Sequence, residues 1–192
     1  MCATIDQASK GRLEIGLGAG WNEVEHSAYG LPFPPVGERM DMLEEACAVI
    51  HGLLTAPVTS FAGRHFRLDA ARCEPKAVQQ PRPPFVLGGQ GERRPLRIAA
   101  RWADQWNYPG TTAEGLRDKL AVLHRHCADV GRDPAAIEVS MHLFHPTEPA
   151  AAAALAGELA DAGCTHVVLY MQRPFPPQTL RDVSRAVADA VL

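Results

Sequence analysis

Three glycines and a glutamine, Gly88-Gly89-Gln90-Gly91, come directly after the short apolar run from Phe85 to Leu87. Because glycine has no Cβ, the backbone N–H groups of such a loop can converge on a ligand without obstruction. An amphipathic segment follows, and the free N–H groups at the start of a helix attract anions. The spacing therefore predicts a site for an anion such as a phosphate. The alternative is a plain tight turn, and a P-loop is excluded because no Lys-Ser or Lys-Thr follows the glycines.

A second glycine-rich segment, GLGAGWN at residues 16–22, follows an alternating apolar run. A dinucleotide-binding fingerprint would need a third glycine where Trp21 stands and a helix that opens at once. Three prolines follow between residues 32 and 35, so this kind of site is excluded. The glycines still allow the backbone to approach a flat ligand closely. The alternative is a loop shaped by its glycines, with Trp21 packed in the core.

Aromatic and polar residues close several of the predicted strands. Trp106 and Asn107 end one strand, His142 lies at the end of the next, and Tyr170 closes the last. In enzymes built on a barrel of parallel strands, the active site lies at the C-terminal ends of the strands. These residues and His26, in the loop after the first strand, are candidates for a substrate pocket. The alternatives are a packing role for the strand residues and a solvated position for His26.

A metal site and a serine hydrolase site are both excluded by spacing. His124, His126 and Cys127 lie close together in the sequence, but residues two apart on a helix point in different directions. The remaining histidines and cysteines make no set of four with the spacing of a zinc site. The G-x-S-x-G motif of serine hydrolases does not occur. We expect no bound metal.

The elements that must position these candidates alternate between strands and helices. Period-two alternation or short apolar runs predict strands, and period-3.6 stripes bounded by capping signals predict helices. The strands are expected at residues 12–18, 85–87, up to 107, 137–143 and 166–171, the last as a buried strand. The helices are expected at 38–54, after the glycine loop, from a capping box at 111–114 to Gly131, at 150–162 and at 179–192. A loop is expected at 19–37, a hairpin turning at Ala62-Gly63 at 58–68, and an extended connector at 74–84.

This order predicts an α/β fold with a parallel sheet. Two strands carry a polar face, Arg12 with Glu14 and Glu138 with Ser140 and His142. Strands of a doubly wound sheet are apolar on both faces, whereas a barrel covers only the outer face with helices. The pattern therefore favours a (β/α) barrel, and an edge strand with one solvated face is the alternative.

Composition limits the class of protein. The chain has 192 residues, 46% of them hydrophobic, with a net charge of −3 and a pI near 6.2. These values predict one globular domain over residues 1–192 and give no electrostatic case for nucleic acid or an anionic membrane. No apolar run has spanning length, and no signal peptide is evident at the start. Five scattered cysteines are expected as reduced thiols, which is typical of a cytoplasmic protein.

A complete (β/α)₈ barrel has eight strands and about 250 residues. Five strands are predicted here, and the chain opens with the tail of a helix that runs into the first strand. We therefore expect three strand-helix units to be absent on the N-terminal side. A truncated reading frame, a fragment, and a partial barrel completed by association are all consistent with this.

Three segments carry a resemblance to a known family: residues 11–46, 73–107 and 110–140. They resemble the luciferase-like monooxygenase family, and most closely its branch that depends on the deazaflavin F420. The resemblance implies a partial TIM barrel with a flavin or deazaflavin at the C-terminal face of the strands. It places the phosphate-bearing tail of that cofactor at the loop Gly88–Gly91. Together with the strand end after residue 16, this makes our candidates for cofactor binding Gly18, Gly20, Asn22, Gly88, Gly89, Gln90 and Gly91. By their places at strand ends and in the loop after the first strand, Trp21, His26, Trp106 and His142 are our candidates for the substrate pocket, and we assign no catalytic acid or base.

The first functional hypothesis is an oxidoreductase in which F420 exchanges a hydride with a small organic substrate. The second is a two-component monooxygenase that uses reduced FMN and O₂, with a flavin reductase as its partner. The third is a non-catalytic fragment that pairs with another chain or a second copy through unpaired strand edges.

Overall fold

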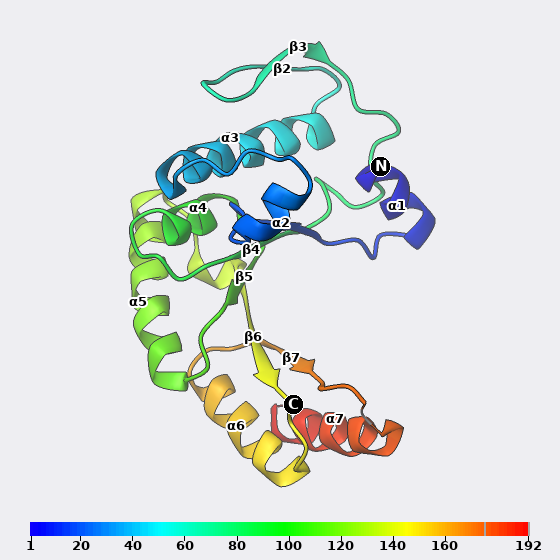
Figure 1. The fold of residues 1–192 in the computed structure, drawn as a ribbon, viewed down its shortest axis with the longest axis vertical. Coiled ribbons are helices and arrows are strands. Elements are labelled where there is room, and N and C mark those ends of the chain that lie inside the picture. The colour runs from blue at the N-terminus through cyan, green and yellow to red at the C-terminus, as the bar shows by residue number, and fades with distance from the viewer. Residues whose placement is uncertain (175, 192) are drawn as a thin grey trace. The chain divides into compact units, whose positions relative to one another are not determined.

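The computed structural model describes residues 1–174 and 176–191, and the chain divides into two compact units, Met1–Leu87 and Gly88–Leu192 (Figure 1). Within the described part of the chain, none of the helices is both long and apolar enough to cross a bilayer. All five cysteines are free, as expected for reduced thiols.

The first unit is built on two parallel strands, β1 (Ile15–Leu17) and β4 (Phe85–Gly88), of which Gly88 already belongs to the second unit. Ile15 pairs with Phe85 and Leu17 with Leu87, so the two apolar runs lie in register. Parallel strands need a long connection between them. That connection contains α2 (Glu23–Ala28), α3 (Val36–Thr55) and the antiparallel hairpin of β2 (Thr59–Ala62) and β3 (Arg67–Ala71).

A buried carboxylate ties the first helix, α1 (Cys2–Ser9), to the connector before β4. Asp6 is fully buried and accepts hydrogen bonds from the backbone N–H groups of Val78 at 2.8 Å and Gln79 at 3.0 Å. The Gln79 side chain donates to Asp6 at 2.7 Å and to the Leu13 carbonyl at 2.7 Å. Burial opposes ionisation, but these bonds together hold the pKa of Asp6 below its usual value.

A second carboxylate holds the hairpin against α3. Glu45 accepts backbone N–H groups from Arg64 at 2.8 Å, His65 at 2.9 Å and Phe66 at 3.0 Å. Here too burial opposes the charge, and the hydrogen bonds outweigh it, so the pKa of Glu45 is lowered. The position of the turn is therefore set by a helix side chain about twenty residues earlier.

The second unit repeats a strand-helix pattern. It contains α4 (Pro95–Trp102), β5 (Gln105–Tyr108), α5 (Ala113–Asp129), β6 (Glu138–Phe144), α6 (Pro149–Asp161), β7 (His166–Tyr170) and α7 (Pro177–Val191). The three strands are parallel, with Asn107 beside Ser140 and Ser140 beside His166. Helix α4 packs on α5, and α6 packs on α7. Apolar side chains with under 2% exposure form the core: Leu96, Ile98, Trp106, Leu116, Leu123, Met141, Leu159 and Val183.

Most predicted elements are confirmed, including the hairpin and the strands at 85–88 and 138–144. Four expectations were wrong in detail. The strand expected at 12–18 is confined to Ile15–Leu17, so Arg12 and Glu14 lie outside it and give it no polar face. The loop expected at 19–37 contains α2, which has no buried residue and hence no apolar stripe to reveal it. The strand β7 is partly exposed rather than buried. Thr112 caps α5 through the N–H of Gly115, so Glu114 does not complete the capping box expected at 111–114.

Candidate functional site

The loop after β1 is held in shape by its own polar groups. Asn22 caps α2, and its side-chain oxygen accepts the N–H of Glu25 at 3.1 Å. Gly20 has φ +75°, a conformation that favours glycine, and a Cβ there would lie 2.9 Å from the His26 ring. Gly20 is therefore required for the approach of His26. Trp21 is 87% exposed, so it does not pack in the core.

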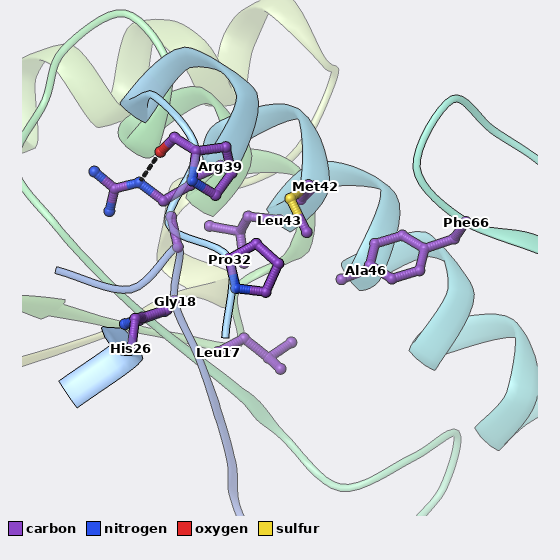
Figure 2. A pocket seen from close by; sticks show the side chains of 11 residues that line it. Leu17, Gly18, His26, Pro32, Arg39, Met42, Leu43, Ala46 and Phe66 are labelled. Carbon is purple, nitrogen blue, oxygen red and sulfur yellow. Dashed lines mark hydrogen bonds between the residues drawn. The ribbon is translucent and has the colours of Figure 1, made fainter. Parts of the chain in front are cut away.

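Beside this loop lies a cavity of about 210 Å³ (Figure 2). Its wall is mostly apolar, and Phe66 extends from the hairpin side toward Ala46 of α3. The cavity brings together two of the predicted residues, Gly18 and His26. The other residues that line it were not predicted from the sequence: Leu17, Ala19, Pro32, Pro34, Arg39, Met42, Leu43, Ala46 and Phe66.

Arg39, at the start of α3, fixes the far side of the loop. Its Nε donates to the Pro34 carbonyl at 2.9 Å, and a second guanidinium nitrogen donates to the Gly20 carbonyl. The guanidinium also lies 3.9 Å from the ring centre of Phe33. Phe33 in turn meets His26 edge to face, with ring centres 4.8 Å apart. These contacts give the cavity a wall whose polar groups are already oriented.

The backbone at Gly16 and Gly18 is uncovered. Gly16 and Gly18 alternate with the apolar side chains of Ile15 and Leu17. At either glycine, no atom lies within 4 Å of the position that a Cβ would occupy. This face therefore leaves room for a planar group to approach the backbone.

In the second unit, the glycine loop is exposed apart from Gly89, which is half-buried. Gly89 has φ +115°, and at Gly88 a Cβ would meet only the Asn107 carbonyl, at 3.9 Å. Helix α4 begins at Pro95 after a turn, and the Leu96 N–H donates to the Gly91 carbonyl at 3.1 Å. The glycines thus precede the helix by a few residues instead of forming its first turn.

Trp106 on β5 is hydrogen-bonded to this loop. Its side chain is fully buried, and Nε1 donates to the Gly89 carbonyl at 2.9 Å. On the turn after the glycines, the Glu92 carboxylate lies 2.6 Å from Lys119 Nζ, and the Glu92 carbonyl lies 2.7 Å from His126 Nε2. The loop is therefore anchored to β5 and α5. The assignment of Trp106 to a substrate pocket stays a prediction.

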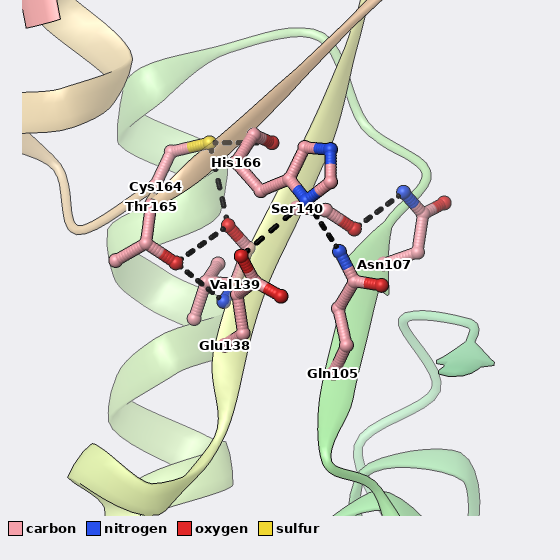
Figure 3. Close-up of polar contacts among 8 residues, drawn as sticks. All are labelled: Gln105, Asn107, Glu138, Val139, Ser140, Cys164, Thr165 and His166. Carbon is pink, nitrogen blue, oxygen red and sulfur yellow. Dashed lines mark hydrogen bonds and ion pairs between the residues drawn. The ribbon is translucent and has the colours of Figure 1, made fainter. Parts of the chain in front are cut away.

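A polar ladder crosses the three strands of the second unit (Figure 3). Asn107 donates to the Ser140 hydroxyl at 3.0 Å. Nδ1 of His166 lies 3.0 Å from Gln105 Nε2 and 3.3 Å from Glu138 Oε1. That nitrogen accepts from Gln105 when it carries no proton and donates to Glu138 when it does. This confirms a polar face on β6.

Two members of this ladder, Gln105 and His166, were not predicted from the sequence as site residues. The signal that could have found Gln105 is its place with Asn107 on either side of the apolar Trp106, which continues the alternation.

His142, the remaining pocket candidate, is half-buried and stacks with Phe144 at 5.6 Å between ring centres. Across residues 1–174 and 176–191, no three His, Cys, Asp or Glu side chains are grouped to hold a metal ion.

Comparison with known proteins identifies the family to which the chain belongs. Residues 1–178 match the luciferase-like monooxygenase family. The chain is 30% identical over 163 residues to an FMNH2-dependent dimethylsulfone monooxygenase of Pseudomonas putida, covering 83% of this chain and 44% of that enzyme. It is 30% identical over 155 residues to the pyrimidine monooxygenase RutA of Allorhizobium ampelinum, covering 77% and 41%. The chain thus spans less than half the length of these curated relatives.

The fold matches an F420-dependent secondary alcohol dehydrogenase with a TM-score of 0.82 at 20% identity, over 100% of this chain and 73% of that one. The predicted fold class, an α/β partial TIM barrel, is confirmed by this match. The family resemblance seen in the sequence is confirmed by the family match over most of the chain. The chain belongs to the luciferase-like monooxygenase family.

Proposed function

We propose that this protein is an oxidoreductase that uses F420 to exchange a hydride with a small organic substrate. The observation that carries the proposal is the fold match to the F420-dependent alcohol dehydrogenase, which extends over the whole chain and 73% of that enzyme. When bound, F420 supplies two-electron chemistry as a hydride carrier, so the protein has to bind, orient and shield the reactants.

The residues present fit such a cofactor. In the first unit, the backbone at Gly16 and Gly18 leaves room for a flat group, since no side chain occupies that space. In the second unit, Gly88 leaves similar room, and Trp106 holds the Gly89 carbonyl away from the loop's free side. The backbone N–H groups of Gly88 to Gly91 and the exposed side chain of Gln90 would bind the phosphate-bearing tail.

Asn22 is proposed as a further cofactor contact. Its oxygen is already used to cap α2. A contact with the cofactor would therefore use the side-chain amide nitrogen.

Alanine substitutions at glycines test the proposal without disturbing the fold. Gly18 and Gly88 have no close neighbour and no left-handed φ, so Gly18→Ala and Gly88→Ala should unfold at wild-type urea concentrations. Each adds a methyl group where the cofactor would approach, and we expect F420 affinity to fall at least about tenfold. Gly157→Ala, inside α6 with open space around it, is the matched control and should bind as the wild type does.

The measurement is an anaerobic titration with F420 and, separately, with FMN, followed by visible absorbance. A wild-type chain that gives no spectral change with F420 at high micromolar concentration would refute the proposal. Equal affinities for the wild type and Gly88→Ala would refute the assignment of the phosphate tail to this loop.

A second candidate keeps the fold and uses reduced FMN with O₂, supplied by a flavin reductase. Its support is the 30% identity with the FMNH2-dependent dimethylsulfone monooxygenase over 83% of this chain. Oxygen consumption on addition of chemically reduced FMN and candidate substrates separates the two, because hydride exchange with F420 consumes no O₂.

A further inference from the structure

The cavity beside the β1 loop has its own recognition chemistry. Its lining is mostly apolar, and His26 and Arg39 are the polar side chains among the residues that form it. An apolar cavity of about 150 Å³ is enough to bind benzene. The volume of about 210 Å³ therefore accommodates a molecule of one ring with small substituents.

The hydrogen bonding of His26 fixes which of its nitrogens is left to accept a hydrogen bond. Nδ1 lies 2.8 Å from the Asn22 carbonyl oxygen. A carbonyl oxygen only accepts, so Nδ1 carries the proton, and Nε2 of the neutral ring is an acceptor. No donor among the described residues bonds to Nε2. The edge contact with Phe33 packs against the ring, and the absence of a Cβ at Gly20 leaves room for the ring in this orientation.

Arg39 does not offer a matching site for an anion. Its Nε and one terminal nitrogen are bonded to the carbonyls of Pro34 and Gly20, and its flat face lies on Phe33. The guanidinium therefore serves as part of the wall, and a bidentate contact with a carboxylate would break those bonds. The acceptor that remains in the cavity is Nε2 of His26, which can accept one hydrogen bond from a ligand.

We propose that this cavity binds a small uncharged molecule with an apolar body and one O–H or N–H group, which donates to Nε2 of His26. The apolar body contacts Leu17, Leu43, Ala46 and Phe66. That this molecule is the substrate of the oxidoreductase rests on the proposed function. Binding of the molecule in the cavity does not depend on the proposed function, because the binding test below uses the chain without any cofactor.

The test compares phenol with toluene, two probes of nearly equal shape that differ in the hydroxyl group. Binding is followed by ¹H–¹³C methyl spectra of the full chain, with the signals of Leu17, Met42 and Leu43 as reporters. We expect phenol to bind about fivefold more tightly than toluene, the effect of one hydrogen bond to a partly exposed neutral acceptor. Equal affinity, or shifts that leave these three residues unaffected, would overturn the proposal on the wild-type chain alone.

Two variants locate the effect. His26→Phe should bind both probes equally, whereas His124→Phe, the same change on the exposed face of α5, should keep the preference for phenol. Ala46→Phe fills the cavity and should abolish binding of both. A preference that persists in His26→Phe, or binding that persists in Ala46→Phe, would place the site elsewhere. Failure of F420 to bind would leave these results unchanged, so the two proposals fail separately.

Discussion

Replacing Trp106 by phenylalanine tests whether the glycine loop depends on a tether from β5. The indole is fully buried, and its Nε1 donates to the Gly89 carbonyl at 2.9 Å. Phenylalanine removes this donor, which costs about 1 kcal/mol for one hydrogen bond. It also leaves part of the indole's volume empty in a packed core, which costs about 1–2 kcal/mol more. We therefore expect the free energy of unfolding to fall by about 2–3 kcal/mol.

The assay is urea unfolding followed by far-ultraviolet circular dichroism. For a denaturant slope of about 2 kcal/mol per molar urea, the middle of the usual range, the midpoint should fall by about 1–1.5 M. Trp21→Phe is the matched control, because Trp21 is 87% exposed and its replacement should change stability by less than about 0.5 kcal/mol. If Trp106→Phe unfolds at the wild-type midpoint, the tether contributes nothing and the reasoning fails.

Four further changes probe other contacts. Glu45→Gln cannot accept all three backbone N–H groups, so its melting temperature at pH 7 should lie below that of the wild type. Burial opposes the charge of Glu45, but the hydrogen bonds outweigh it and lower the pKa from 4.5. The contribution of Glu45 to stability is therefore present above that pH and is lost as the pH falls below it. Melting curves of the variant should lack this loss of stability in acid. Burial raises the pKa of the Cys47 thiol to about 12. Only the unfolded thiol then ionises near pH 10, which lowers stability there by about 1–2 kcal/mol. Burial also raises the pKa of Cys127 and Cys164, so in urea titrations Cys47→Ala should show a smaller alkaline drop than the wild type. Gly89→Ala places a side chain at φ +115° and should cost about 1–3 kcal/mol in the same titration. Asn22→Asp keeps the helix cap but loses the amide donor, so it should keep wild-type stability and weaken F420 binding in the absorbance titration.

Local patterns predicted the elements well because each pattern repeats several times. The apolar stripe of α3 extends over several turns, and the predicted bounds of 38–54 lie within two residues of Val36–Thr55. The alternation in β6 runs through seven residues and gives both its position and its polar face. The glycine loop was identifiable because glycines grouped at the end of an apolar strand favour a turn in which the backbone is left uncovered. Each of these signals is contained within a single continuous segment of the chain.

Contacts between distant segments left no such signal. Glu45 on α3 accepts from a turn about twenty residues later, and His166 meets Gln105 at a separation of 61 residues. A charged residue on the face of a helix reads as solvated whether or not it later caps a hairpin. The wall that Arg39 builds with Phe33 was missed for this reason, since neither residue has a distinctive neighbour in the sequence.

Asn22 shows how one side chain can satisfy two interpretations. Its place after a glycine-rich strand end predicts a cofactor contact, yet Asn22 with Glu25 three residues later is also the start signal of a helix. The structure has Asn22 as the cap of α2, a role that we did not predict from the sequence. Capping uses the oxygen and fixes the side-chain torsions, so the direction of the amide nitrogen is set before any ligand binds. A local structural role here lowers the free-energy cost of a binding role, because the entropy of ordering the side chain is already lost on folding.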